Sequence, residues 1–195
     1  ELNNSGKSKT LLALAIEVDF KIIQECFGDA VVFEKKAVWN SIGRIVETQE
    51  IVRLGEFVLR EKTLSEVPPS LAAEKILVEK VLSGELKLNQ WNKAIDVWLR
   101  KVRWVAKLYP EKNLLTYSDD DQEIILLEMC SGSRSYKDIK NLPVLDYFKN
   151  AMDWHEQNFV VEMTPEKIKL ASGRSMKLSY EEDGRVKGSG LIQDF

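Results

Sequence analysis

The chain has 195 residues, of which 44% are hydrophobic, enough to fill the core of one domain or two small ones. Its formal net charge of −3 excludes a protein that is basic throughout, so any nucleic-acid surface must be a local patch. No apolar run approaches the roughly 18 residues of a membrane-spanning helix, and no basic-then-apolar leader begins the sequence, so we expect a cytoplasmic protein without a membrane partner.

The start of the sequence and its two cysteines give only weak signals for chemistry. The chain begins at Glu1 without an initiator methionine, which favours a piece cut from a longer protein. The letters Gly6-Lys7-Ser8 are similar to the end of a phosphate-binding loop, but Glu1 stands where that motif needs a glycine, so we reject it. Cys26 and Cys130 lie outside any Cys-x-x-Cys or Cys/His cluster, which predicts reduced thiols and no structural zinc site.

Residues 1–65 are typical of a short helix followed by an antiparallel β meander. Leu11 to Val18 is an apolar run of strand length, although periodicity alone does not exclude a helix. Asp19 can cap a helix that Gly28 ends with a left-handed turn. Three runs rich in β-branched residues follow, and their charges of mixed sign predict a solvated face. These runs are residues 31–39, 44–54 and 56–62.

Residues 66–157 predict a bundle of about four helices organised around the stretch from Leu88 to Tyr109. Wound at about 100° per residue, this stretch separates an apolar arc from a polar one, so other elements must cover it. We expect the preceding helix, capped by Ser70, to pair with it in antiparallel fashion. One more helix is expected within residues 142–157. The apolar arc comprises Trp91, Ala94, Ile95, Trp98, Leu99, Val102, Val105, Ala106 and Tyr109.

Three groups of polar residues in this region are candidates for chemistry. The polar arc carries Lys93, Arg100, Arg103 and Lys107, with Asp96 in its middle. Such a stripe is usually the solvated side of a helix, and the aspartate weakens a phosphate track. Three aspartates follow Ser118 without the spacing of a calcium loop, so we interpret them as helix-capping residues. The only histidine, His155, has no nucleophile nearby in the sequence and is expected to be exposed or locally paired.

A β pattern returns from residue 158. Apolar residues alternate on both sides of the loop at 171–174, which contains Gly173, and this predicts a hairpin. Cations concentrate on the hairpin and just after it, so an acidic protein acquires one local basic patch. These cations are Lys167, Lys169, Arg174, Lys177, Arg185 and Lys187.

Several segments carry a family resemblance in their order along the chain. They are Phe27-Gly28-Asp29, the turn at 39–43, Leu54-Gly55, the loop at 131–135, Asp153-Trp154, the stretch 164–184 and the closing residues 191–195. Together they resemble the C-terminal region of HrpB, a family of bacterial ATP-dependent helicases of the DEAH/RHA group. In that family the region follows two RecA-like motor domains and helical accessory domains. The resemblance therefore implies that this chain is truncated at both ends and that the motor domains of the same chain are its partners.

The motor chemistry is absent from the sequence itself. Neither a Gly-x-x-x-x-Gly-Lys-Ser/Thr motif nor an Asp-Glu-x-His box occurs, and ATP hydrolysis needs a phosphate cradle and an acid that holds magnesium. ATP and magnesium would belong to the motor domains of the parent helicase, so we expect no cofactor, no metal and no catalytic residue in this chain. Measuring magnesium-dependent ATP turnover by the chain alone tests this expectation.

Taken together, the sequence predicts an α+β fold with three segments. These are a β-rich segment at 1–65, a helical bundle at 66–157 and a C-terminal β segment at 158–195, for which an OB-like barrel is one possibility. The resemblance implies a non-catalytic module that shapes the channel for single-stranded RNA or DNA. We expect the phosphate contacts from Lys169, Arg174 and Lys177, with the backbone of Ser172 and Gly173 close to the strand.

Two alternatives remain open at this stage. The hairpin loop could be a solvated turn that is present for folding reasons alone. The whole chain could be a protein–protein interaction module that binds through its Trp-rich helices or an edge of the meander, without any nucleic-acid role. An exposed apolar patch would favour the second alternative, and a continuous basic surface would favour the helicase module.

Overall fold

The computed structural model describes residues 17–190, and the chain divides into two units. The N-terminal unit contains residues 17–36 and Gln49–Leu64, and the C-terminal unit contains Ala37–Thr48 and residues 65–190. Most of the apolar run expected as a strand at residues 11–18, the letters Gly6-Lys7-Ser8 and the closing residues 191–195 lie outside the described part. Within residues 17–190 no helix is both long enough and apolar enough to cross a membrane.

The N-terminal unit begins with a short helix. Helix α1 (Phe20–Phe27) starts where predicted, because the carboxylate of Asp19 accepts a hydrogen bond of 2.7 Å from the backbone N–H of Lys21. Its end differs from the prediction. Gly28 has right-handed helical angles, with φ −49°, and leads directly into the 3₁₀ turn η1 (Gly28–Ala30), so the left-handed stop is not formed there.

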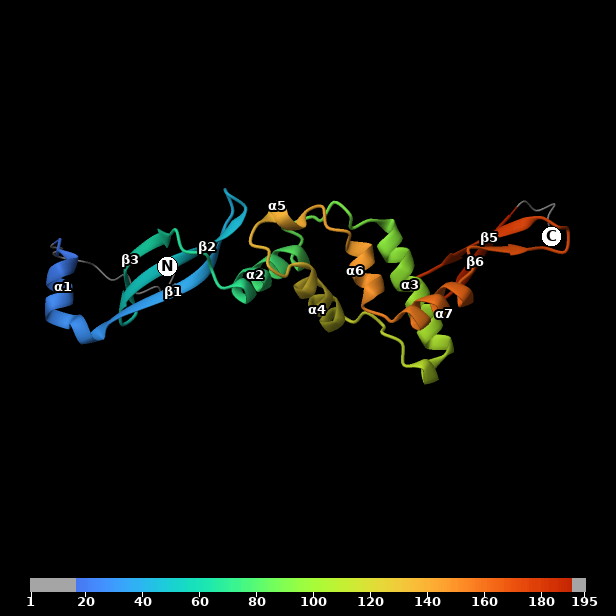
Figure 1. Ribbon diagram of the computed structural model, residues 1–195, viewed down its shortest axis with the longest axis horizontal. Coiled ribbons are helices and arrows are strands. Elements are labelled where there is room, and N and C mark those ends of the chain that lie inside the picture. The colour runs from blue at the N-terminus through green and yellow to red at the C-terminus, as the bar shows by residue number, and fades with distance from the viewer. Residues whose placement is uncertain (1–16, 191–195) are drawn as a thin grey trace, which may run out of the picture. The chain divides into compact units, whose positions relative to one another are not determined.

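The predicted meander is confirmed. Three strands lie side by side in the order β1-β2-β3, joined by short turns that require antiparallel neighbours (Figure 1). Gly55 adopts φ +57° in the tight turn between the second and third strands, a left-handed conformation that favours glycine. The strands are β1 (Val31–Asn40), β2 (Ile45–Leu54) and β3 (Phe57–Leu64).

The tip of the β1–β2 hairpin belongs to the C-terminal unit. The backbone N–H of Val46 donates to the carbonyl of Arg134 at 2.8 Å, and that of Tyr136 donates to the carbonyl of Arg44 at 3.0 Å. The Arg44 guanidinium lies 3.8 Å from the centroid of the Tyr136 ring. The tip is therefore anchored on the loop before the short helix α5 (Tyr136–Ile139).

The central bundle contains four helices of ten or more residues, as expected, and two shorter ones. The long helices are α2 (Ser70–Leu82), α3 (Lys93–Leu108), α4 (Asp119–Met129) and α7 (Trp154–Met163). The shorter helices are α5 and α6 (Val144–Asn150), and a 3₁₀ turn, η2 (Pro110–Lys112), follows α3. The aspartates after Ser118 do cap α4, because Ser118 and Asp121 form a reciprocal capping box.

Helix α3 organises the core of the C-terminal unit. Its predicted apolar arc is buried at Ile95, Trp98, Leu99, Val102 and Val105, and it packs against α6, α7 and β5. The contact also satisfies buried polar groups, because Trp98 Nε1 donates to the Tyr117 hydroxyl at 3.1 Å. That hydroxyl donates in turn to the carbonyl of Phe148 at 2.6 Å. Burial raises the pKa of Tyr117 to about 12.

Three predictions about the helix starts and pairing were wrong. Helix α3 starts five residues later than expected, because the side chain of Asn92 caps it by accepting from the N–H of Ala94 at 2.9 Å. Ser70 is the first helical residue of α2 and donates its hydroxyl to Glu74, so it does not act as the cap. Helix α2 packs mainly against α4, and the expected α2–α3 pair is not the main contact.

The region after residue 142 also differs from the prediction. Two helices, α6 and α7, replace the single one expected, since Asp153 and Glu156 form a capping box that starts a new helix. Val160 and Val161 are helical although valine favours strands. Val160 is completely buried, so tertiary packing decides its conformation.

The C-terminal β segment is a three-stranded antiparallel sheet in the order β4-β5-β6, open within the described residues. It packs on α3 through Tyr180, whose ring meets the Trp104 ring edge-on at a centroid distance of 5.3 Å. The Tyr180 hydroxyl donates to the carbonyl of Pro165 at 3.0 Å. The strands are β4 (Lys167–Lys169), β5 (Ser175–Tyr180) and β6 (Val186–Ser189), and the molecule as a whole has the α+β fold predicted.

Candidate nucleic-acid interface

The register of the C-terminal sheet gathers lysines on one of its two faces. Directly paired residues of antiparallel strands place their side chains on the same face. Lys167 pairs with Lys177, Lys169 pairs with Ser175, and Lys187 pairs with Ser179. We call the resulting surface the basic face. It comprises Lys167, Lys169, Ser175, Lys177, Ser179, Lys187 and Ser189, all of them exposed.

The opposite face of the sheet is apolar, and it packs on α3 at its Tyr180 end. Its members are Ile168, Met176, Leu178, Tyr180 and Val186. Tyr180 is buried against Trp104, and burial raises its pKa above the ordinary tyrosine value. Alternate side chains of a strand lie on opposite faces, so the lysines lie on the face away from Tyr180, where all four are exposed.

The basic face contains a pairing that works against the stability of the sheet. Lys167 and Lys177 are direct cross-strand partners, and two like charges in that position repel each other. Lys187 is compensated, since its ammonium lies 3.5 Å from a carboxylate oxygen of Glu181. The sheet therefore presents an excess of positive charge at β4 and at the adjoining part of β5.

The turn at the end of β4 and β5 is well defined by its own backbone. The N–H of Gly173 donates to the carbonyl of Leu170 at 2.9 Å, and the N–H of Leu170 donates to the carbonyl of Arg174 at 2.8 Å. Gly173 has φ +80°, the left-handed conformation that a three-residue hairpin loop of this kind requires. A Cβ atom at Gly173 would meet no heavy atom within 4 Å. The left-handed conformation of the turn therefore accounts for a glycine at position 173. The side of the turn on which a Cβ atom of residue 173 would lie is open.

The structure brings the five predicted site residues onto one hairpin. Lys169 and Lys177 lie on the basic face, and Ser172, Gly173 and Arg174 form the turn at its end. Sequence reasoning left two further lysines of this face, 167 and 187, out of the candidate site. The alternation of the Lys-Ile-Lys segment could have placed Lys167 beside Lys169, since residues two apart in a strand share a face.

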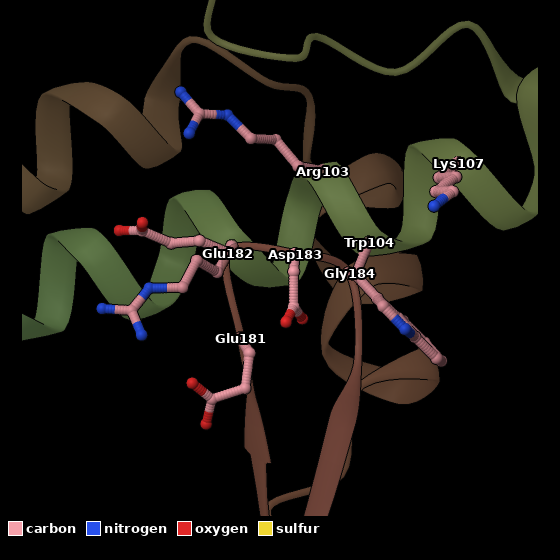
Figure 2. A pocket seen from close by; sticks show the side chains of 8 residues that line it. Arg103, Trp104, Lys107, Glu181, Glu182, Asp183 and Gly184 are labelled. Atoms are coloured by element: carbon pink, nitrogen blue, oxygen red, sulfur yellow. The ribbon is translucent and has the colours of Figure 1, made fainter.

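The cations Arg100, Arg103 and Lys107 of α3 face polar groups of the protein itself. Arg103 donates to the carbonyls of Thr116 and Tyr117 at 3.3 and 3.1 Å. Figure 2 shows the rest of this region, a pocket of about 140 Å³ where the acidic β5–β6 turn faces α3. Asp183 in that turn binds Arg185 at 2.7 Å, which lowers the pKa of the aspartate. The pocket is lined by Arg100, Arg103, Trp104, Lys107, Glu181, Glu182, Asp183 and Gly184.

The stripe is the solvated helix side that was predicted, since Lys93, Arg103 and Lys107 are exposed, and Asp96 and Arg100 are half-buried. Carbonyls and carboxylates of the protein face Arg100, Arg103 and Lys107, so a phosphate chain would have to compete with them there.

The histidine and the two cysteines do not form a metal site in the described part of the chain. His155 is exposed, as predicted, and its ring meets that of Trp154 at a centroid distance of 5.1 Å. Among residues 17–190 no group of three His, Cys, Asp or Glu side chains could hold a metal ion. Cys26 is exposed and Cys130 is buried, and burial raises the pKa of the Cys130 thiol to about 12.

Comparisons with known proteins place this geometry in a family context. Residues 125–195 match the family described as ATP-dependent helicase C-terminal, HrpB_C. No curated protein matches the sequence. The fold is similar to that of the E. coli DExH-box NTPase HrpB, with a TM-score of 0.57 and 16% identity over 92% of this chain. It is also similar to the Escherichia coli DEAH/RHA helicase HrpB, with a TM-score of 0.56 and 16% identity over 85% of this chain.

These matches extend over different parts of the chain and of the relatives. The chain spans 22% of the length of each of the two solved HrpB chains. The family match covers α7 and the C-terminal sheet, and therefore includes the basic face. The predicted resemblance to the C-terminal region of the HrpB helicases is confirmed, by the family match over residues 125–195 and by a shared fold over most of the chain.

Proposed function

We propose that this chain is a non-catalytic accessory module from the C-terminal region of an ATP-dependent helicase, and that its basic face contacts a single strand of RNA or DNA. The RecA-like motor domains of the same protein would hold ATP and magnesium and supply the force. One observation carries the nucleic-acid part of the proposal. The ladder register places Lys167, Lys169 and Lys177 on one exposed face, with Lys167 directly opposite Lys177.

The chemistry of this face suits a phosphate backbone better than a base edge. An ammonium group is a compact point charge that attracts phosphate oxygens without selecting a base. The hydroxyls of Ser175, Ser179 and Ser189 lie among the lysines and can donate to the same oxygens. A phosphate between Lys167 and Lys177 would also relieve their mutual repulsion. We therefore expect binding that tolerates any sequence and weakens steeply with salt.

Charge reversal at the paired lysines tests this proposal. In the double variant Lys167→Glu and Lys177→Glu, two like charges still face each other across the strands, and only their sign is reversed. We expect the Kd of a fluorescent 12-nucleotide single strand, measured by anisotropy, to rise about tenfold or more. The slope of log K against log salt should become shallower by about 1.4, at about 0.7 per phosphate contact.

A matched control separates local contact from total charge. Lys75→Glu with Lys137→Glu makes the same change of charge at two exposed lysines on α2 and α5. If the two double variants weaken binding equally, or neither weakens it, the basic face does not contact the strand.

The alternative function, a protein-interaction module, is favoured by one surface feature. A groove of about 420 Å³ beside the end of α2 is lined mainly by apolar side chains. If the unaltered chain binds no single strand even at low salt, this alternative becomes the better account. The apolar lining comprises Val81, Leu82, Leu86, Leu88 and Trp91.

A further inference from the structure

A second hollow on the C-terminal unit combines an apolar floor with lysines at its rim. It has a volume of about 370 Å³ and lies between α3 and α6, next to Glu166 just before β4. Lys93, Lys101 and Lys149 line it, and Val97 and Leu145 contribute apolar surface. Volumes of roughly 300–1,000 Å³ are typical of sites for small organic ligands, and such sites combine apolar walls with a few polar groups.

The charges around this hollow favour an anion. Three lysines and one glutamate line it, which leaves an excess of two positive charges. Lys101 neutralises the charge of the glutamate, because its ammonium lies 3.5 Å from a carboxylate oxygen of Glu166. Lys149 lies over the Trp98 ring, 5.4 Å from the centroid, and no carboxylate among the lining residues neutralises it or Lys93.

Two apolar residues that line the hollow, Trp98 and Val97, differ in their burial. Trp98 is buried, and its Nε1 donates a hydrogen bond to the buried Tyr117 hydroxyl. Val97 keeps 39% of its surface exposed, although it lies on the helix that organises the core. An accessible aliphatic surface beside two uncompensated ammonium groups matches a ligand with a flat apolar ring and a phosphate.

We propose that this hollow binds one nucleotide of the single strand, with the base against Val97 and Leu145 and the phosphate between Lys93 and Lys149. The proposal rests on the proposed function, since it adds a second contact point to the strand that the basic face holds. A strand fixed at two points of the C-terminal unit would bind more tightly than at either point alone.

A substitution that fills the hollow while adding positive charge separates this proposal from general attraction. Val97→Arg places a larger cationic side chain on an exposed position of α3, and arginine has a higher helix propensity than valine. If only charge mattered, binding of a 12-nucleotide strand would become tighter. We expect the Kd to rise about tenfold, because the base loses its place. Val161→Arg adds the same charge at an exposed valine of α7 and should leave the Kd unchanged or lower it.

A second pair of measurements tests the two parts of the nucleotide separately. Lys93→Glu with Lys149→Glu should raise the Kd more than the control Lys75→Glu with Lys137→Glu, and circular dichroism checks that each variant is folded. An abasic strand of the same length should bind to the Val97→Arg variant at least as tightly as to the unaltered chain, because it has no base to lose and gains the added positive charge. AMP at millimolar concentration should compete only weakly, because a free nucleotide lacks the second contact.

The outcomes distinguish this inference from the proposed function. If Lys167→Glu with Lys177→Glu weakens binding but Val97→Arg does not, the hollow is not a nucleotide site and the basic face remains one. If a loss with Val97→Arg is equally large for the abasic strand, the base does not enter the hollow and the inference is overturned. If none of these variants changes the Kd, both proposals fail.

Discussion

Lys167 lies directly opposite Lys177 in the β4–β5 ladder, so two lysine side chains share one face of the sheet as direct cross-strand partners. Like charges in this position destabilise a sheet by about 0.2–1 kcal/mol. A pairing that costs stability is understandable if the two lysines serve a ligand. Function and stability should then respond in opposite directions to the same substitution.

The first prediction follows from that relationship. Lys167→Thr removes the repulsion and introduces a residue with high β propensity. We expect the free energy of unfolding in urea to rise by about 0.5 kcal/mol while the affinity for a single strand falls. Lys187→Thr is the control, because Lys187 faces Ser179 and pairs with Glu181. A loss of stability in Lys167→Thr would show that the repulsion is unimportant.

The second prediction concerns the buried network under α3. Tyr117→Phe leaves Trp98 Nε1 without an acceptor and the carbonyl of Phe148 without a donor. We expect the free energy of unfolding to fall by about 1–3 kcal/mol, since both groups are buried. Tyr147→Phe, at a partly buried tyrosine of α6, should change it by less than about 0.5 kcal/mol. Equal effects would contradict the role assigned to the network.

Local patterns in the sequence predicted the elements of this fold better than their packing. The apolar arc of α3 and the three strands of the meander follow from residue spacing, which is a local property. The break before α7 was also visible, because Asp153 and Glu156 have the spacing of a capping box. The helical state of Val160 could not be predicted from the local sequence pattern, since it depends on burial against distant residues.

In the candidate site, too, local sequence patterns predicted the elements but not how they pair and pack. Spacing alone indicated that Lys169 and Lys177 lie near one turn, but the partner of Lys177 depends on the exact register. The contact of Tyr180 with Trp104 decides which face of the sheet is open, and it joins residues 76 positions apart in the sequence. No local pattern contains that information.

The third prediction concerns acid stability. Glu74 accepts a hydrogen bond of 2.6 Å from Ser70 and one of 2.8 Å from the N–H of Gly132, and these hold its pKa below the ordinary value of 4.5. A lowered pKa in the folded state stabilises the protein above the unfolded pKa, and this contribution is lost as the pH falls through the folded value.

Glu74→Gln should therefore reduce the free energy of unfolding by about 1 kcal/mol at pH 7 and by progressively less below pH 4.5. Urea unfolding at a series of pH values checks this. Glu79→Gln, on the exposed side of the same helix, controls for the loss of one charge. A difference between Glu74→Gln and the unaltered chain that grows toward acid would contradict the account.

The fourth prediction concerns the two thiols. Cys26 is exposed, whereas Cys130 is completely buried and its pKa is raised to about 12, first by burial and then by the charge of Glu74. A thiol reagent at pH 8 should modify Cys26 rapidly and Cys130 only when the protein unfolds. The Cys26→Ser variant should show almost no fast reaction. Rapid modification of Cys130 in the native protein would show that the core opens near α4.

The salt dependence of single-strand binding by the unaltered 195-residue chain tests the central claim most directly. If Lys167, Lys169 and Lys177 each neutralise one phosphate, log K should fall with log salt at a slope of about −2, or steeper if the hollow also binds. Binding that does not depend on salt, or no binding at about 50 mM salt, would contradict the claim that the basic face holds a strand.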